Sequence, residues 1–174
     1  MSLPVNALIA LKALQIGSAA AASPSKEVAL RMLEQAISWL GASTEEEALA
    51  RRAFYVAARA EMMRALGDPT SDRDALKSIG KGANGSVYYW YMRLEEATES
   101  RTGMRWQGSA SPYAAGGGTS QDQDNPYLSS QGRMYRAMKA IGLEEKLLSD
   151  SDRRFLERTT LYDLLEKHGI PFAA

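Results

Sequence analysis

Side chains that could carry out chemistry are scarce in this sequence. It contains no cysteine and a single histidine, His168. Thiolate nucleophiles, disulfides, iron–sulfur clusters, cysteine-bearing zinc sites and multi-histidine metal sites are therefore excluded. A serine triad would have to use His168, yet the sequence has no Gly-x-Ser-x-Gly nucleophile turn. Because His168 follows Lys167 at the end of a predicted helix, we expect it to cap that helix or to face solvent.

A glycine-rich string lies in the middle of the chain, where residues 79–87 read Ile-Gly-Lys-Gly-Ala-Asn-Gly-Ser-Val. It resembles the Gly-x-Gly-x-x-Gly-x-Val loop that covers the ATP phosphates in protein kinases. The resemblance stops there, because the Val-Ala-Ile-Lys, His-Arg-Asp and Asp-Phe-Gly segments of that family are absent. A dinucleotide site would need a strand before the glycines and a helix after them, within a βαβ unit. We therefore predict a glycine-rich turn and no bound cofactor.

Acidic residues occur in adjacent sets, at 45–47, 95–96 and 144–145. Two carboxylates can catalyse glycoside hydrolysis when they face each other across a substrate. Adjacent positions on a helix do not face each other, so we interpret these sets as first-turn charges and solvated faces. Residues 122–125 (Asp-Gln-Asp-Asn) lack the glycine and the bidentate glutamate of a calcium-binding EF-hand loop. The sequence predicts neither a metal site nor an enzyme.

Basic residues are the remaining candidates for contact with a partner. One predicted helix carries Arg51, Arg52, Arg59 and Arg64, and another carries Arg133, Arg136 and Lys139. Such spacing can place guanidinium groups against phosphates. The chain has 21 basic and 21 acidic residues, a formal net charge of zero. Because a protein that coats nucleic acid is usually strongly basic, we favour surface ion pairs or an acidic protein neighbour for these arginines.

The elements that position these side chains are predicted to be helices. The chain has 174 residues, 45% of them hydrophobic, which is enough for one domain with a sizeable core. Helical spacing of apolar residues covers 3–22, 23–40, 43–66, 86–101, 129–141 and 149–168, with a shorter helical segment over 72–79. Ser23 before Pro24, and Ser43 in a capping box with Glu46, are the predicted helix starts. Residues 86–91 also have strand propensity, so a short strand is the alternative there.

The first predicted helix, residues 3–22, is apolar enough to suggest a signal peptide or a membrane span. It lacks a basic region at its start, and Lys12 interrupts the middle of the apolar run. We therefore expect an amphipathic helix that packs on the core or on a neighbouring subunit, and no membrane contact.

Residues 103–128 have a different composition, rich in glycine and without periodicity. A loop of this length inside a compact domain is uncommon and is usually functional or disordered. Four large apolar side chains nevertheless occur in it: Met104, Trp106, Tyr113 and Tyr127. An arm that gains order on a partner would have this mixture. The predicted fold is all-α, a small bundle of five or six helices: a helical body over 1–102, an extended arm over 103–128, and C-terminal helices over 129–174 that pack on the body.

This organisation resembles that of the head–tail connector proteins of tailed bacteriophages, the adaptors of the virion neck. The resemblance covers residues 42–101 and is carried by the helical bundle, by the segment 78–88 leading into a helix, and by the arm. It implies a non-enzymatic, ring-forming structural subunit of the virion, assembled in the host cytoplasm. Copies of the same chain and other virion proteins, such as portal and tail components, would be its partners.

The candidate partner-binding residues are Arg51, Arg52, Arg59, Met104, Trp106, Tyr113 and Tyr127. The alternative function is a DNA-binding packaging or regulatory subunit. Its basic face would be made by Arg51, Arg52 and Arg59 or by Arg133 and Arg136. No catalytic, metal-binding or cofactor-binding residue is predicted.

Overall fold

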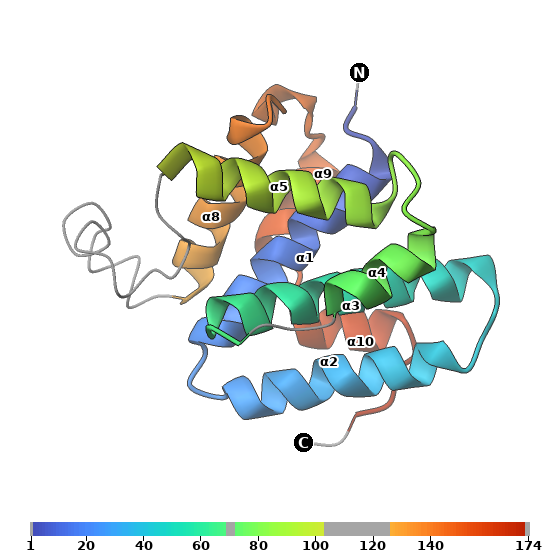
Figure 1. The fold of residues 1–174 in the computed structure, drawn as a ribbon. Helices are drawn as coiled ribbons and strands as arrows, with labels where there is room; N and C mark the ends of the chain where they lie inside the picture. The colour runs from blue at the N-terminus through green and yellow to red at the C-terminus, as the bar shows by residue number, and fades with distance from the viewer. Residues whose placement is uncertain (1, 69–71, 103–125, 173–174) are drawn as a thin grey trace.

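A computed structural model describes residues 2–68, 72–102 and 126–172, and every regular element in these ranges is helical (Figure 1). The all-α class is therefore confirmed. The described ranges carry eight α-helices, more than the five or six expected. They are α1 (Val5–Ala22), α2 (Lys26–Gly41), α3 (Glu46–Ala65), α4 (Asp72–Gly80), α5 (Val87–Thr102), α8 (Pro126–Ala140), α9 (Asp150–Arg158) and α10 (Leu161–Lys167). One 3-10 turn, η2 (Glu145–Leu147), precedes α9.

Helix α1 runs through the centre of the molecule, and α3, α5 and α8 pack around it (Figure 1). Every residue from Ala10 to Gly17 is buried, because neighbouring helices cover α1 on several sides. Its predicted packing on the core is confirmed, whereas the expected one-sided, amphipathic character is wrong. Within the described ranges, α1 is also the one helix that is long and apolar enough to span a membrane, and more than half of it is buried inside the fold.

Helices α1 and α3 come into direct backbone contact at Gly17. A Cβ atom at this position would lie 2.4 Å from the carbonyl oxygen of Ala58 and 2.7 Å from the Cβ of Glu61. Real Cβ atoms do not approach other heavy atoms so closely, because interiors are already packed at crystal-like density. The crossing therefore requires glycine.

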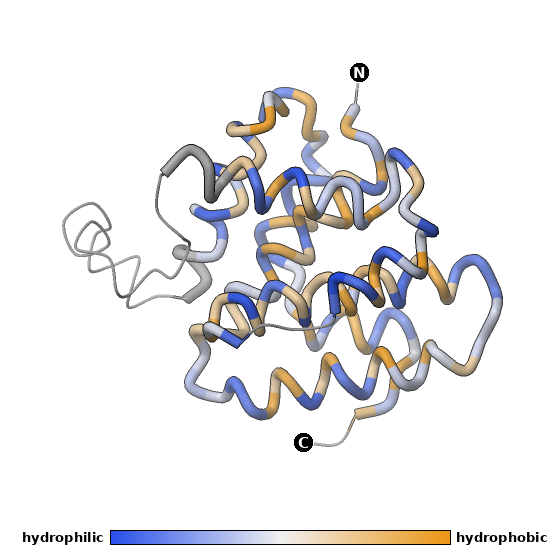
Figure 2. Tube along the Cα trace, in the orientation of Figure 1, coloured by the Kyte–Doolittle hydropathy of each residue, from blue (hydrophilic) through white to orange (hydrophobic). Residues whose placement is uncertain are grey.

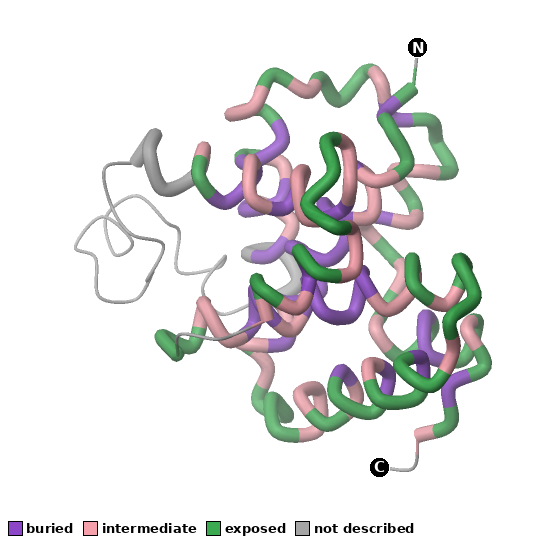
Figure 3. The backbone as a smooth tube through the Cα atoms, turned by 45° about the vertical axis from the view of Figure 1, so that its right-hand side comes forward, coloured by how far each residue is buried: buried purple, intermediate pink, exposed green. Residues whose placement is uncertain are grey.

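Helix α2 forms an outer layer on α3, with hydrophobic and hydrophilic residues alternating along it (Figure 2). It buries Leu33, Ala36 and Leu40 and turns its other face to solvent. Figure 3 shows that the buried residues of the molecule lie toward its middle, where α1 and α3 cross. The one-sided burial of α2 follows from its apolar residues, which recur at helical spacing on one face.

The glycine-rich string forms the turn between α4 and α5, as predicted. Gly82 and Gly85 have positive φ angles of 65° and 80°, which glycine adopts without steric cost. The hydroxyl of Ser86 accepts a hydrogen bond from the backbone N–H of Tyr89 (3.2 Å), and α5 begins at the next residue. The helix predicted over 86–101 is confirmed and the strand alternative is wrong.

Two helix starts differ from their predicted caps. The hydroxyl of Ser23 accepts from the backbone N–H of Ser25 (3.0 Å), so it closes a turn ahead of α2 instead of capping it. Likewise, Ser43 accepts from the backbone N–H of Glu45 (3.1 Å), and the predicted capping box with Glu46 does not form. In both cases the side chain reaches an amide two residues ahead, which stabilises a turn rather than a helix end.

The predicted last helix, over 149–168, is two helices. Ser149 caps the first of them, α9, by accepting from the backbone N–H of Asp152 (3.0 Å). Thr160 starts α10 with a capping box: its hydroxyl accepts from the N–H of Asp163 (3.1 Å), and the Asp163 carboxylate accepts from the N–H of Thr160 (3.0 Å). This reciprocal pair ends one helix and begins the next, and Thr-x-x-Asp was its visible signal in the sequence.

The predicted arm falls largely outside the described residues. Met104, Trp106 and Tyr113 lie there, so the structure says nothing of them. The boundary at 128 is wrong, because α8 already begins at Pro126 and includes Tyr127. Proline is favoured in the first turn of a helix, where its missing N–H costs nothing.

Candidate functional site

Arg59, one of the predicted partner-binding residues, joins three helices of its own chain. Its Nη1 lies 2.7 Å from Asp72 Oδ2 on α4, and its Nη2 lies 2.9 Å from Glu34 Oε2 on α2. The surrounding carboxylates raise the pKa of Arg59, although partial burial opposes them. The guanidinium of Arg59 therefore links α3 to both α2 and α4 through two ion pairs.

Arg51 and Arg52 also have neighbours within the chain. Arg51 pairs with Glu47 one turn earlier on α3, an exposed contact of the kind worth less than about 1 kcal/mol. Arg52 approaches Gly41 at the end of α2, and its buried Nε has no hydrogen-bond partner among the described residues. All three predicted arginines are partly buried. The described structure therefore does not gather them into one fully exposed basic face.

Arg133, assigned by sequence to a second basic face, is completely buried. Its Nε donates to Glu61 Oε2 (2.7 Å) and its Nη2 to Glu61 Oε1 (3.3 Å), which joins α8 to α3. Arg136 and Lys139, on the same helix, are exposed. The assignment of Arg133 to a DNA-binding face is wrong, because burial keeps its guanidinium away from any phosphate.

Glu61 is the centre of a buried cluster of charges. It is fully buried and accepts from Arg133, from Arg64 Nη2 (2.8 Å) and from the hydroxyl of Ser18 (2.7 Å). Burial favours the neutral acid, but the guanidiniums of Arg133 and Arg64 outweigh it and hold the pKa of Glu61 well below its usual range. The carboxylate is therefore ionised at neutral pH and satisfied entirely by its own chain.

A second buried carboxylate, Glu95 on α5, extends this cluster. Tyr91 donates its hydroxyl to Glu95, Arg64 Nε lies 3.0 Å from Glu95 Oε1, and Arg73 pairs with the other oxygen. Burial and the nearby carboxylate of Glu61 raise the pKa of Glu95 above its ordinary value, against the effect of these donors. We call Glu61, Glu95, Arg64 and Arg133, together with the exposed Arg73, the buried ion network.

The buried ion network connects helices that are far apart in the sequence. Its five members come from α3, α4, α5 and α8, and Ser18 adds α1. A satisfied polar network in a low-dielectric interior fixes how its helices pack. Both carboxylates are occupied by donors of the same chain, so this cluster supports a structural role. The sequence shows only its local pair, Glu61 and Arg64, which are three residues apart on one helix.

Lys12, on α1, is the centre of a second buried polar group. Its side chain is fully buried, and Nζ donates to Gln15 Oε1 (2.8 Å) and to the carbonyl oxygen of Leu156 (3.1 Å). The ring of Phe155 lies beneath it, 5.5 Å from Nζ to the centroid. Gln15 in turn donates to the hydroxyl of Ser130 (3.2 Å). Both hydrogen-bond acceptors of this cation are uncharged.

The burial of Lys12 makes the stability of the protein depend on pH. Burial lowers the pKa of Lys12 from 10.5 to about 7, opposed by the charge of Asp163. Between these values the unfolded chain binds the proton and the folded chain does not, so the free energy of unfolding rises with pH. We expect Lys12 to contribute a rise of about 3 kcal/mol between pH 7 and 9.5.

Urea denaturation at pH 7 and at pH 9.5 measures this effect. Lys12→Met keeps the volume of the side chain and removes the titrating group, so we expect the variant to be more stable at pH 7. The rise of about 3 kcal/mol in the free energy of unfolding between pH 7 and 9.5 should be absent from this variant. An unchanged pH dependence in Lys12→Met would contradict the assignment.

His168 occupies the C-cap position of α10 and faces the core. Its Nδ1 lies 2.7 Å from the hydroxyl oxygen of Tyr55, and the two rings meet edge to face. Burial, with the charges of Arg51 and Lys167, lowers the pKa of His168 to about 4. The expected capping position is therefore confirmed, whereas a charged or fully exposed imidazole is not found, because the ring is half-buried and neutral at physiological pH.

The aromatic run at the start of α5 is mostly internal. Tyr91 is fully buried, and Trp90 is partly buried against the core. Arg93 lies over the rings of Trp90 and Tyr89, at 5.2 and 5.6 Å from their centroids. The guanidinium thus occupies the face on which a nucleic-acid base would stack.

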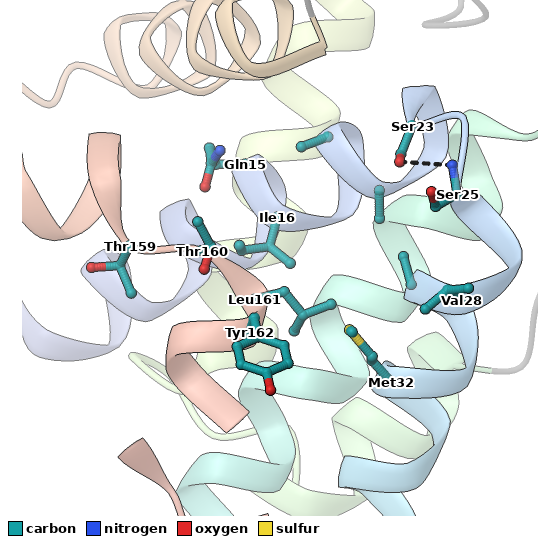
Figure 4. A pocket seen from close by; sticks show the side chains of 13 residues that line it. Gln15, Ile16, Ser23, Ser25, Val28, Met32, Thr159, Thr160, Leu161 and Tyr162 are labelled. Atoms are coloured by element: carbon teal, nitrogen blue, oxygen red, sulfur yellow. Dashed lines mark hydrogen bonds between the residues drawn. The ribbon is translucent and has the colours of Figure 1, made fainter. Parts of the chain in front are cut away.

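A cavity of about 280 Å³ lies between α1, α2 and the start of α10 (Figure 4). Ile16, Met32 and Leu161 contribute apolar side chains to its wall. Gln15, Thr159 and Thr160 are among the polar residues of its lining. The sequence did not reveal this cavity, because its wall combines α1 and α2 with α10, which is far from them in the chain.

Comparisons with known proteins identify no relative. A scan of protein-family models finds no match to this chain. Searches of curated proteins and of solved structures find no match either. Within the described residues, no three His, Asp or Glu side chains gather in a group that could hold a metal ion.

Proposed function

We propose that this protein is a non-enzymatic assembly subunit that forms rings with copies of itself. Its place would be the head–tail connector of a bacteriophage virion, between portal and tail proteins. The observation that carries the proposal is the long connection between two helices that pack on each other, α5 and α8. The resemblance in sequence organisation supplies the virion context.

The connection is longer than the fold requires. Packed helices in a bundle are usually joined by about two to eight residues. Here residues 103–125 separate the end of α5 from the start of α8, although both helices pack on α1 and on each other. This segment contains Met104, Trp106 and Tyr113, side chains whose burial on a partner would offset the cost of ordering the chain. Contact with neighbouring subunits is the role that this composition supports.

The helical body supports a structural role for a separate reason. The two buried carboxylates of the ion network accept hydrogen bonds from groups of the same chain. Two large aromatic side chains are instead exposed: Trp39 on α2 is 51% exposed and Tyr162 on α10 is 58% exposed. Tryptophan and tyrosine are enriched at protein interfaces. We place Trp39 and Tyr162 among the candidate contact residues.

Replacement of residues 103–125 by a short Gly-Ser linker tests the proposal. The replacement ends before Pro126, so that α8 stays intact. We expect circular dichroism and thermal unfolding to match the full chain, because the described helices already pack on one another, while self-assembly and portal binding are lost. A full-length variant with Met104, Trp106 and Tyr113 all changed to serine is the matched control, and it should lose assembly as well. Assembly retained in both proteins would overturn the proposed role of the segment.

A further inference from the structure

The cavity between α1, α2 and α10 has a mostly apolar wall. Ile16, Met32 and Leu161 line it from these three helices (Figure 4), and the small side chains of Ala20 and Ala29 leave room between them. An apolar cavity of about 150 Å³ binds benzene, so a volume of about 280 Å³ has room for the two fused rings of an indole. The thioether of Met32 is also a favourable neighbour for an aromatic ring.

Exposed aromatic side chains mark the same region. Among the described residues, Tyr162 and Trp39 are the two aromatic side chains that are more than half exposed. Tyr162 lines the cavity, and Trp39 follows Met32 by seven residues, about two turns further along the same face of α2. Aromatic side chains left exposed beside an apolar cavity are typical of a surface that a protein partner covers.

The connection between α5 and α8 rejoins the fold close to this cavity. It comprises residues 103–125, and α8 begins at Pro126. Ser130, one turn into α8, accepts a hydrogen bond from the amide of Gln15 (3.2 Å), and Gln15 belongs to the lining of the cavity. The connection therefore ends about one helical turn from a residue of the cavity wall.

A ring needs two unlike surfaces on each copy. A contact between identical patches closes as a dimer, whereas a contact between unlike surfaces repeats from copy to copy until it closes as a ring. The proposed function supplies one such surface, the segment 103–125 with its large apolar side chains. The apolar cavity has the size and the lining of the unlike surface.

We propose that the cavity binds Trp106 of a neighbouring copy, with the indole between Ile16, Met32 and Leu161. This inference rests on the proposed function and adds the receiving side of the ring contact to it. Tryptophan is the side chain most typical of interface hot spots. The 23 residues of the connection span at most about 80 Å when extended, which is enough to reach a neighbouring copy and return to α8.

A peptide of residues 103–125 tests the binding separately from assembly. It is titrated calorimetrically into the full-length Trp106→Ser variant, whose own segment lacks the anchor. We expect one peptide to bind per chain. A peptide carrying Trp106→Ser should bind at least about thirtyfold more weakly, which is the loss typical of a tryptophan hot spot. Equal binding of the two peptides, or no binding of either, overturns the proposal.

Two variants locate the bound peptide. Met32→Trp, combined with Trp106→Ser, fills the cavity and should abolish peptide binding, whereas Arg31→Trp, at an exposed neighbouring position of α2, should leave it unchanged. Nuclear Overhauser contacts between the peptide indole and the Met32 methyl group require no substitution in the cavity. Peptide binding that survives Met32→Trp, or contacts confined to residues elsewhere, overturns the proposal.

Disulfide crosslinking distinguishes docking between copies from docking within one chain. The chain has no cysteine, so Gln107→Cys with Tyr162→Cys introduces its only thiols, one beside Trp106 and one at the cavity. We expect disulfide-linked multimers after oxidation. Lys146→Cys in place of Tyr162→Cys is the control, because the Lys146 side chain is 78% exposed and outside the cavity lining. A disulfide that forms only within each chain overturns the proposal.

Light scattering of the unsubstituted chain separates this inference from the proposed function. A ring that forms although the peptide does not bind leaves the assembly role intact and overturns the docking of Trp106. A chain that binds the peptide and crosslinks between copies, but forms no ring, supports the docking and contradicts the ring.

Discussion

Glu61→Gln is expected to lower the free energy of unfolding by about 3–5 kcal/mol. The glutamine amide fits the space but carries no charge, and Arg133 remains completely buried beside it. A buried guanidinium that loses its carboxylate keeps its full desolvation cost without the compensating ion pair. Since domains of this size are stable by about 5–15 kcal/mol, the loss would be a large share of the total. Urea denaturation followed by circular dichroism measures it.

A matched pair of variants isolates the effect of burial. Glu34→Gln makes the same change at a half-exposed ion pair with Arg59, and we expect it to cost less than about 1 kcal/mol. The double variant Glu61→Leu with Arg133→Met removes both charges, so it should recover most of the stability lost in Glu61→Gln. Equal losses in Glu61→Gln and Glu34→Gln would show that the buried ion network does not hold the helices.

Gly17→Ala is expected to lower the free energy of unfolding by about 1–3 kcal/mol. Alanine normally favours a helix over glycine by up to about 1 kcal/mol. At this crossing, however, the added methyl group would lie 2.4 Å from the carbonyl oxygen of Ala58, a backbone atom that cannot rotate away. Helices α1 and α3 would have to separate, and the contacts of Glu61 beside them would be disturbed.

Gly132→Ala is the control for this substitution. Gly132 lies inside α8, and the atoms nearest to its added methyl group belong to the flexible end of the Arg136 side chain, at 3.0 Å and beyond. We expect a neutral to stabilising effect, because the side chain can move and the helix propensity improves. Thermal unfolding of the two variants compares them directly. If Gly17→Ala unfolded at the same temperature as Gly132→Ala, the close crossing of α1 and α3 at Gly17 would be contradicted.

The helical elements were predictable because their signals are local. Apolar spacing identified α1, α3, α5 and α8. The predicted ranges that begin at 86 and 149 start at the serines whose hydroxyls accept from the first turns of α5 and α9. The errors arose where local patterns compete. Ser43 accepts from the backbone N–H of Glu45, two residues ahead, instead of forming the predicted capping box with Glu46. The capping box of Thr160 begins a new helix inside the range 149–168, where the spacing of apolar residues predicted a single helix.

The buried polar groups were not predictable from the sequence, because they depend on distant partners. Glu61 and Arg133 are 72 positions apart, and no local pattern distinguishes them from surface charges. Lys12 was visible as an interruption of an apolar run. Its burial depends on Gln15 nearby and on Leu156, 144 positions away. Composition alone, meanwhile, set residues 103–128 apart as a separate segment, although α8 takes up the last three of them.

The mass of the purified full chain in solution, measured by light scattering over a wide range of concentrations, tests the proposed function most directly. The proposal predicts a discrete ring whose mass is a multiple of 19.0 kDa, or a monomer that becomes such a ring only when portal or tail proteins are added. A compact monomer or dimer that persists under both conditions, and gains mass only when duplex DNA is added, would contradict the proposal and favour the DNA-binding alternative.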